Sequence, residues 1–296
     1  LFLAALGSLD QASVREPRFE RAARDAVGWL RGPGGLDRTG FVRYRPDPNG
    51  LINQGWKDSA KAVVFADGTP ASGEIALVEA QGYAWLGLQE AARLGRAVWG
   101  DPAWAGQLEQ IADRLRRDIS DRFWLPGADF PALALDGRDR QVDLLASNAG
   151  HLLWAGVVDP DQARRVAERL LSPDFFSGWG LRTVASGQAP YSPMSYHNGS
   201  VWPHDTALTA LGMVRYGMTG HAERLAAGLL EAAQHWVGRL PELFGGFGRD
   251  VFPAPVSYPH AAAPQAWAAA ATVVAARIAQ MSSGVGPAAS GRGGRA

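Results

Sequence analysis

The stretch DPAWAGQLEQIADRLRRDI, residues 101–119, decides the fold class of this chain. Asp101 is suited to cap a helix, and Pro102 then takes the first helical position, where its missing N–H is no loss. The same start signal recurs in DPDQARRVAERLL, residues 159–171, where apolar side chains share one helical face: Ala163, Val166 and Leu170. Both stretches therefore predict amphipathic helices.

Helical periodicity recurs along the rest of the chain, whereas the alternation typical of strands is scarce. The opening LFLAALGSLD looks like a helix entered part-way through. Further helices are expected from about Arg18, over 73–94, 148–157 and 201–215, around Leu225–Trp236, and in an Ala-rich stretch that Pro264 opens. This pattern predicts an all-α toroid with a site at one end of the ring.

Long segments rich in Gly, Pro and aromatic residues separate these helices, at 32–72, 125–146, 172–199 and 240–263. Loops of more than about 15 residues are uncommon in compact domains unless they carry function. We therefore expect the functional residues in these loops. Residues 1–282 are expected to form one domain, and the low-complexity stretch 283–296 is expected to be a disordered tail.

The composition excludes several classes of function. The chain has 296 residues, with 29 basic and 29 acidic side chains, so no basic excess favours a nucleic-acid partner. Zero cysteines exclude disulfides, thiolate metal sites and cysteine catalysis. The opening lacks the basic region of a signal peptide, and the Ala-rich helix is less apolar than a membrane span. A cytoplasmic protein without a membrane partner is expected.

Two carboxyl groups are the best candidates for acid–base chemistry: Asp58 in NQGWKDSAK, residues 53–61, and Glu242 in RLPELFGGF, residues 239–247. Each lies in a loop rich in glycine and aromatic residues. Aromatic faces stack on the apolar face of a pyranose, and planar polar groups bond its hydroxyls. Glycoside hydrolysis then needs one protonated and one ionised carboxyl. The loops therefore point to a sugar site.

Structural interpretations of the same residues stay open. Asp58 before Ser59 is also typical of a helix N-cap or an Asx turn, and Glu242 of a first-turn helix acid. His197 and His204 suggest a metal, but no third ligand stands at a metal-like spacing, so none is expected. No phosphate loop, dinucleotide fingerprint or haem motif is present, so no organic cofactor is expected.

Seven motifs then occur in the order found in bacterial amylo-α-1,6-glucosidases of the glycogen-debranching type: NQGWKDS, VEAQGYAWLGL, SNAGHLLWAG, FSGWGLRT, YSPMSYHNGSVWPHDTAL, RLPELFGGF and YPHAAAPQAWAAAA. The chain resembles this group of six-hairpin glycosidases from Leu1 to about Ala276. More distantly it is similar to trehalases and processing α-glucosidases, which invert the anomeric centre. The resemblance implies an (α/α)6 barrel and an α-glucan-like oligosaccharide or polysaccharide substrate. It also implies Asp58 as general acid and Glu242 as general base.

The resemblance also implies a missing part. Such proteins carry a β-rich N-terminal domain and earlier barrel helices, and a closed barrel needs twelve helices, whereas about eight or nine are expected here. We therefore expect the C-terminal portion of a barrel, incomplete at its N-terminal side, with the N-terminal part of the parent chain absent.

Lys57 and Lys61 are the only two lysines of the chain, and both lie within three residues of Asp58. A cation beside Asp58 favours its ionised form, whereas a general acid must hold a proton. Neighbours on an extended loop point to opposite sides, so Lys57 is expected to hold a substrate hydroxyl or another carboxylate. The alternative is that the two lysines lie beside Asp58 by chance. Inversion is expected if about 6.5–9.5 Å separates the two carboxyls.

The expected substrate-binding residues lie in the same motifs. Trp202 would stack on the glycone, Trp56 would desolvate the acid, and the others would bond hydroxyls or shape the cavity. The full set is Trp56, Lys57, Gln81, Tyr83, Trp179, Arg182, Tyr196, His197, Asn198, Trp202 and His204. Two further classes of function stay open: a non-catalytic carbohydrate-binding or scaffolding toroid, and an epimerase or lyase that uses two histidines.

Overall fold

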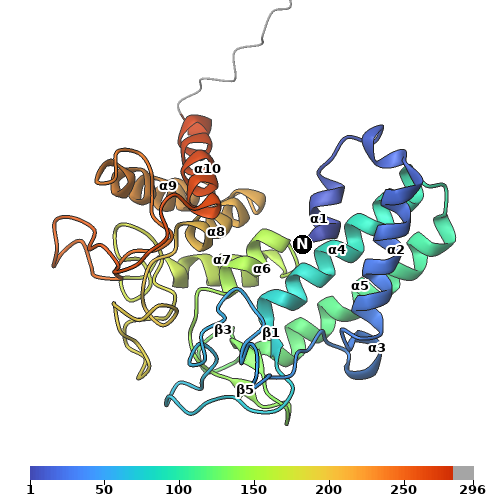
Figure 1. Ribbon diagram of the computed structural model, residues 1–296, viewed down its shortest axis with the longest axis horizontal. Coiled ribbons are helices and arrows are strands. Elements are labelled where there is room, and N and C mark those ends of the chain that lie inside the picture. The colour runs from blue at the N-terminus through green and yellow to red at the C-terminus, as the bar shows by residue number, and fades with distance from the viewer. Residues whose placement is uncertain (283–296) are drawn as a thin grey trace, which may run out of the picture.

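The structure, a computed structural model, describes residues 1–282, so the predicted tail 283–296 lies outside the described residues. Helices dominate it, which confirms the all-α prediction (Figure 1). The helices are α1 (Phe2–Gly7), η1 (Ser13–Arg15), α2 (Pro17–Arg31), α3 (Leu36–Thr39), α4 (Val78–Ala97), α5 (Pro102–Phe123), α6 (Ala149–Ala155), α7 (Pro160–Leu170), α8 (Pro203–Arg215), α9 (Thr219–Gln234) and α10 (Ala266–Ser282). The strands are β1 (Ala76–Leu77), β2 (Trp124–Leu125), β3 (Phe130–Pro131), β4 (Ala134–Leu135) and β5 (Gln141–Val142).

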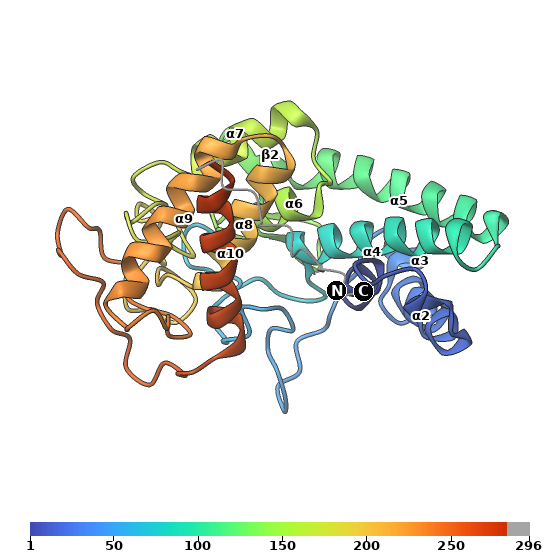
Figure 2. The same ribbon diagram turned by 90° about the horizontal axis from the view of Figure 1, so that it is seen from above.

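The larger helices form successive hairpins. Helices α4, α6, α8 and α10 contact one another in that order, and α5, α7 and α9 pack against the helices that precede them. Helix α1 packs on α4, at the opposite end of the row from α10, so the helices follow an arc (Figures 1 and 2). An inner row of helices, each followed by an outer helix that runs back against it, is the arrangement expected of an α-toroid.

The two helix starts that an Asp–Pro pair predicts are confirmed. The Asp101 carboxylate accepts a hydrogen bond from the Trp104 backbone N–H at 2.9 Å, and that of Asp159 from Gln162 N–H at 2.8 Å. Each cap satisfies a donor that the first turn leaves unpaired. Helix α4 starts at Val78, not at residue 73, because residues 76–77 pair with β4 as strand β1.

The inner helices approach closely where glycine removes a side chain. A Cβ at Gly150 of α6 would overlap the Thr209 side chain of α8, and one at Gly212 of α8 would overlap the backbone of Leu153 and Trp154. Both glycines therefore let α6 and α8 pack at short range. This contact fixes the distance between α6 and α8, whose side chains His151 and Asp205 meet at the site.

The long connecting segments gather on one side of the helices (Figure 1). Strands β1, β4 and β5 form an antiparallel sheet in that order, and β2 pairs with β3. A second hydrophobic cluster lies under these segments and includes Val63, Ile75, Leu133, Val142 and Val184. It joins the first, second and third long loops into one packed layer. Within residues 1–282, the structure has no helix that is both long and apolar enough to cross a membrane.

Candidate active site

The loop that carries Asp58 is held on both sides of that residue. The Asn53 amide, itself bonded to the Tyr44 hydroxyl at 2.7 Å, donates to the Ser59 carbonyl at 2.8 Å. The Ser59 hydroxyl lies 2.8 Å from His197 Nδ1. Asp58 itself is exposed. No helix begins between the end of α3 and Val78, so the N-cap interpretation of Asp58 is wrong.

Glu242 lies half-buried in the fourth long loop, bonded through both carboxylate oxygens. Oε1 accepts from the Tyr196 hydroxyl at 3.0 Å, and Oε2 accepts from the Ala262 backbone N–H at 3.1 Å. No helix starts at Glu242, so the first-turn helix interpretation is also wrong. Phe244, two residues further on, is bridged to Val201, so the loop is fixed to the start of α8.

The Tyr196–His197 segment joins the loops of the two candidate carboxyls, which stand 184 positions apart in the chain (242 − 58): Tyr196 bonds Glu242, and His197 bonds Ser59. Burial, the hydrogen bond to Glu242, and the negative charges of Glu242 and Asp58 together raise the pKa of Tyr196. Glu242 contacts the Tyr196 hydroxyl directly, whereas Asp58 acts on it through its charge alone. Only the fold could bring these two loops together.

Aromatic rings pack beside this pair around Trp56. Its ring is stacked on His151 at 5.7 Å between centroids, and it meets the edges of Trp202 at 5.7 Å and His204 at 4.8 Å. Trp202 is only 2% exposed, stacks on His197, and donates Nε1–H to the Tyr196 carbonyl at 2.8 Å. Trp202 therefore supports the Tyr196 segment, and it does not offer the open stacking face that we expected.

A group of buried ionisable residues lies under the Asp58 loop. Glu79 in the first turn of α4 is 1% exposed, and both of its carboxylate oxygens lack a hydrogen-bond partner among residues 1–282. His151 of α6 lies 2.8 Å from Asp205 of α8 through Nε2, and its Nδ1 contacts the Tyr83 hydroxyl. Sequence analysis missed Glu79, His151 and Asp205. Their signal was an ionisable residue within an otherwise apolar helix motif.

Burial and charge shift the protonation of this group. Burial raises the pKa of Glu79, against the opposing charges of His151 and Lys57. Burial alone would also raise the pKa of Asp205, but the hydrogen bond and charge of His151 outweigh it, and the pKa is lowered. Asp205 therefore favours its ionised form, whereas burial weakens that preference in Glu79.

The two histidines of the YHNGSVWPHD segment are uncharged near neutral pH. Burial lowers the pKa of His197 to about 3, and the charge of Lys57 acts in the same direction. Burial likewise lowers the pKa of His204 to about 3. A histidine with so low a pKa is a poor proton donor near neutrality, which argues against an epimerase based on this pair. Among residues 1–282, no group of three or more His, Asp or Glu side chains could hold a metal ion.

A cavity of about 580 Å³ opens beside this cluster, at the N-terminal ends of the inner helices. Its polar wall includes Trp56, Glu79, Tyr83, His151 and His204. Its apolar wall comes from α8, α10 and neighbouring residues: Trp154, Ala207, Leu208, Leu211, Trp267, Ala270, Ala271 and Val274. Aromatic rings beside a few polar groups suit a ring that has one apolar face and several hydroxyls.

Of the predicted site residues, Trp56, Tyr83 and His204 line this cavity, whereas Asp58, Glu242 and the others do not. Four of those others hold the protein's own structure together. Gln81 is fully buried, and its amide bonds the backbone of Val42 and Leu77. Trp179 is buried beneath the Arg249 guanidinium, which lies 4.4 Å from its ring. These two have structural contacts in place of the substrate contacts expected of them.

Arg182 and Asn198, the other two, stabilise the loops. Arg182 donates to the carbonyls of Gly246 at 2.6 Å and Pro173 at 2.7 Å, and so holds the segment that follows Glu242. The Asn198 amide donates to the Lys61 carbonyl at 2.7 Å. Both side chains are buried and join loops that are distant in sequence.

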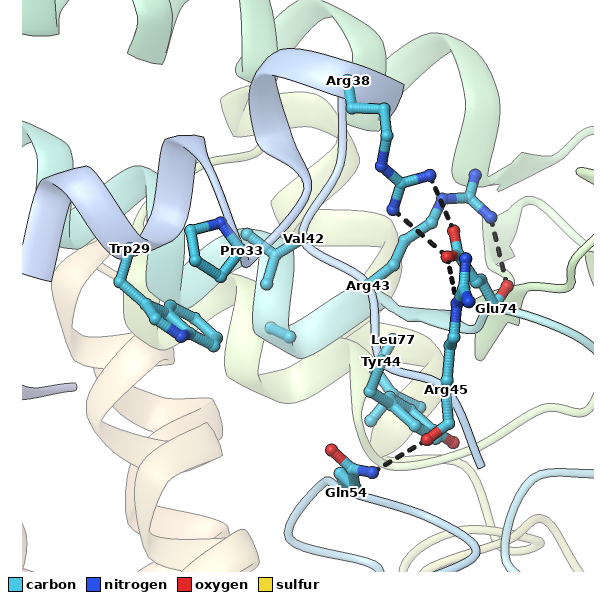
Figure 3. A pocket seen from close by; sticks show the side chains of 11 residues that line it. Trp29, Pro33, Arg38, Val42, Arg43, Tyr44, Arg45, Gln54, Glu74 and Leu77 are labelled. Carbon is cyan, nitrogen blue, oxygen red and sulfur yellow. Dashed lines mark hydrogen bonds and ion pairs between the residues drawn. The ribbon is translucent and has the colours of Figure 1, made fainter. Parts of the chain in front are cut away.

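A second cleft, of about 620 Å³, adjoins the cavity and shares Gln54, Leu77 and Ala80 with it (Figure 3). Three arginines line its polar side: Arg38, Arg43 and Arg45. Glu74 accepts from Arg38 at 3.0 Å and from Arg45 at 2.6 Å. Trp29 lies on the opposite side and is 54% exposed. The cleft thus combines cationic groups with an exposed aromatic ring.

The hairpin arc, with the Asp58 loop lining a cavity at the helix N-termini, agrees with the (α/α)6 architecture of the six-hairpin glycosidases. Residues 52–244 match the mannosylglycerate hydrolase MGH1-like glycoside hydrolase domain. The chain belongs to that family of glycoside hydrolases. A search of the curated proteins gave no match.

Solved structures share the fold at low sequence identity. GH63 mannosylglycerate hydrolase from Thermus thermophilus, in complex with glucose, is 18% identical with a TM-score of 0.63, over 88% of this chain and 70% of that one. The same enzyme in complex with Tris is 17% identical with a TM-score of 0.54, over 68% of this chain and 45% of that one. Neutral trehalase Nth1 from Saccharomyces cerevisiae is 15% identical with a TM-score of 0.56, over 75% of this chain and 41% of that one. The chain thus spans less than half of the latter two matched chains, and these likenesses show the fold alone.

Proposed function

We propose that this chain cleaves α-glucosidic bonds with inversion, with Asp58 as general acid and Glu242 as general base. The observation that carries the proposal is that one segment joins both carboxyl-bearing loops: Tyr196 bonds Glu242, and His197 bonds Ser59 of the Asp58 loop. Trp56 of that same loop lines a cavity with aromatic and polar walls. The matched glycoside hydrolase family supports it.

The proposed reaction is a single displacement at the anomeric carbon. Asp58 gives its proton to the glycosidic oxygen as the bond to the leaving sugar breaks. A water attacks the opposite face and passes its proton to Glu242. Tyr196 donates to Glu242, so it fixes the orientation of the base. Exposure suits Asp58 to meet a leaving group that arrives from solvent.

The substrate we propose is an α-glucan-like oligosaccharide of the kind that amylo-α-1,6-glucosidases cleave. The cavity would take the terminal sugar, and the adjoining cleft would take further units of the chain, with Trp29 as a stacking surface. We also propose that an N-terminal part of the parent chain completes the barrel beside α1, as the resemblance implies.

The arginine-lined cleft favours a second candidate substrate, an α-glycoside whose leaving group carries a carboxylate. Arg38 and Arg45 are both exposed and already hold the Glu74 carboxylate. Mannosylglycerate, after which the matched family is named, carries such a group. Guanidinium groups bind carboxylates in a bidentate manner, which neutral glucans cannot exploit.

The test is hydrolysis of α-1,6-linked gluco-oligosaccharides and of mannosylglycerate, with NMR of the first anomer released. Release of the β-anomer, lost in Asp58→Asn and Glu242→Gln and kept in the control Asp67→Asn on an exposed turn, is expected. Release of the α-anomer would refute inversion, and activity that survives either substitution would refute the residue roles. The preferred substrate decides between the two candidates.

A further inference from the structure

The Lys57 side chain is buried directly beside the exposed Asp58. It is 3% exposed, donates from Nζ to the Thr183 carbonyl at 2.7 Å, and lies 4.9 Å from the Trp56 ring centroid. Lysine is almost never fully buried unless it is paired. Lys57 is thus buried while Asp58 is exposed, and Nζ holds a backbone carbonyl in place of the substrate hydroxyl or carboxylate that we expected.

The acceptor for Lys57 belongs to a firmly held segment. The Thr183 carbonyl also accepts from the Ser147 backbone N–H at 3.1 Å, and Thr183 N–H donates to the Ser200 carbonyl at 2.9 Å. The residues on either side are bridged too, Arg182 to Val201 and Val184 to Ala146. Lys57 therefore ties the Asp58 loop to a fixed part of the core.

The charged groups around Lys57 come from several elements. Glu79 of α4 and Asp205 of α8 both favour its charged form. The imidazoles of His197 and His204 have low pKa values, to which Lys57 contributes, and His151 lies between Asp205 and Tyr83. Burial nevertheless lowers the pKa of Lys57 to about 8, so the ammonium is present at neutral pH and is lost in mild alkali.

We propose that Lys57 is the positioning residue of this site: its ammonium, and not its neutral amine, holds the loop in the geometry that presents Asp58 to the substrate. This inference rests on the proposed role of Asp58 as general acid. A neutral amine still donates to Thr183, but it loses its attraction to Glu79 and Asp205. Loss of the charge would therefore loosen the loop.

The same geometry explains why a lysine stands here in a chain that otherwise uses arginine. A single carbonyl accepts from Nζ in the structure, whereas a guanidinium brings five donors in a planar fork. Most of those donors would be buried without partners. Lys57→Arg should therefore fail to restore function, although it keeps the charge.

The first experiment reads the ammonium directly. Protein labelled with ¹³C-lysine gives two side-chain signals, because the chain has two lysines, and Lys61→Met assigns them. We expect the Lys57 signal to titrate with a midpoint near 8. A Lys57 signal that stays unchanged from pH 6 to pH 10 would overturn the proposed charge switch.

The second experiment measures hydrolysis against pH in Lys57→Met, with Lys61→Met as the matched control on an exposed side chain. We expect kcat to fall about 100-fold in Lys57→Met with little change in KM, as for a misplaced catalytic group. The part of the alkaline fall of kcat that has its midpoint near pH 8 in the wild type should also vanish, whereas any fall set by the proton of Asp58 remains. Wild-type kcat in Lys57→Met, or a retained fall with its midpoint near pH 8, would overturn the inference.

A third variant separates charge from packing. The chain has no cysteine, so Lys57→Cys creates a single thiol that 2-bromoethylamine converts, in the unfolded state, to a lysine analogue before refolding. Because its sulfur lowers the basicity of the amine, recovered activity should show an alkaline limb at lower pH than the wild type. Recovery without that shift would refute the charge requirement. A wild type that cleaves none of the substrates would refute the proposed function, whereas an active wild type with fully active Lys57 variants would refute only this inference.

Discussion

The buried pair of His151 and Asp205 gives the sharpest stability prediction. Asp205 is fully buried, with one oxygen 2.8 Å from His151 Nε2 and the other without a hydrogen-bond partner among residues 1–282. Asp205→Asn keeps the shape but removes the charge that faces both His151 and Lys57. Breaking a buried pair from one side costs about 3–5 kcal/mol, and retention of a neutral hydrogen bond places this isosteric change near the lower end, about 3 kcal/mol.

The assay for Asp205→Asn is urea unfolding at pH 7, followed by circular dichroism and tryptophan fluorescence. For a domain of this size, a loss of about 3 kcal/mol corresponds to a fall in Tm of roughly 6–12 °C. Asp161→Asn is the matched control, because Asp161 is 81% exposed and its contact with Arg164 is long, at 3.8 Å. It should change stability by less than about 0.5 kcal/mol. A loss below about 1 kcal/mol in Asp205→Asn would refute the view that this pair holds the helix ends together.

Three further outcomes follow from the same structure. Tyr196→Phe removes a hydrogen bond to the Glu242 carboxylate that is worth about 1.5–3 kcal/mol. In steady-state hydrolysis, kcat/KM should therefore fall roughly 10- to 150-fold. An unchanged kcat/KM would exclude this contact from the reaction. Because the pKa values of His197 and His204 lie near 3 in the folded protein, the unfolded chain binds more protons between about pH 3 and 6.5. The free energy of unfolding, measured by urea titration, should therefore be greatest above pH 6.5 and should fall by up to about 2.7 kcal/mol per pH unit as the pH decreases. A free energy of unfolding that stays constant from pH 7 to pH 5 would contradict neutral histidines. Gly212→Ala should destabilise the protein by about 1–3 kcal/mol, because the new Cβ overlaps α6. The control Gly106→Ala in α5, where a Cβ meets open space, should stabilise the protein by about 0.5–1 kcal/mol. Equal effects of the two variants in thermal melts would argue against close packing at Gly212.

Local signals predicted the helices well where the start is chemically marked. Asp101 and Asp159 with their following prolines have the same effect in any context, because a cap bonds only its own first turn. The start of α4 was missed because strand pairing between residues 76–77 and β4 depends on a partner about 60 residues away.

The sequence by itself determined the all-α class, the helix starts marked by Asp and Pro, and the type of chemistry in the loops. Those properties depend on near neighbours and on residue type alone. Only the tertiary structure decided which polar side chains serve the site and which serve the backbone. Gln81 and Trp202 read as sugar contacts in the sequence but are buried in the structure, while Glu79 became visible only through its burial without a partner among the described residues. Burial and partnership are set by residues far apart in the chain, so no local pattern records them.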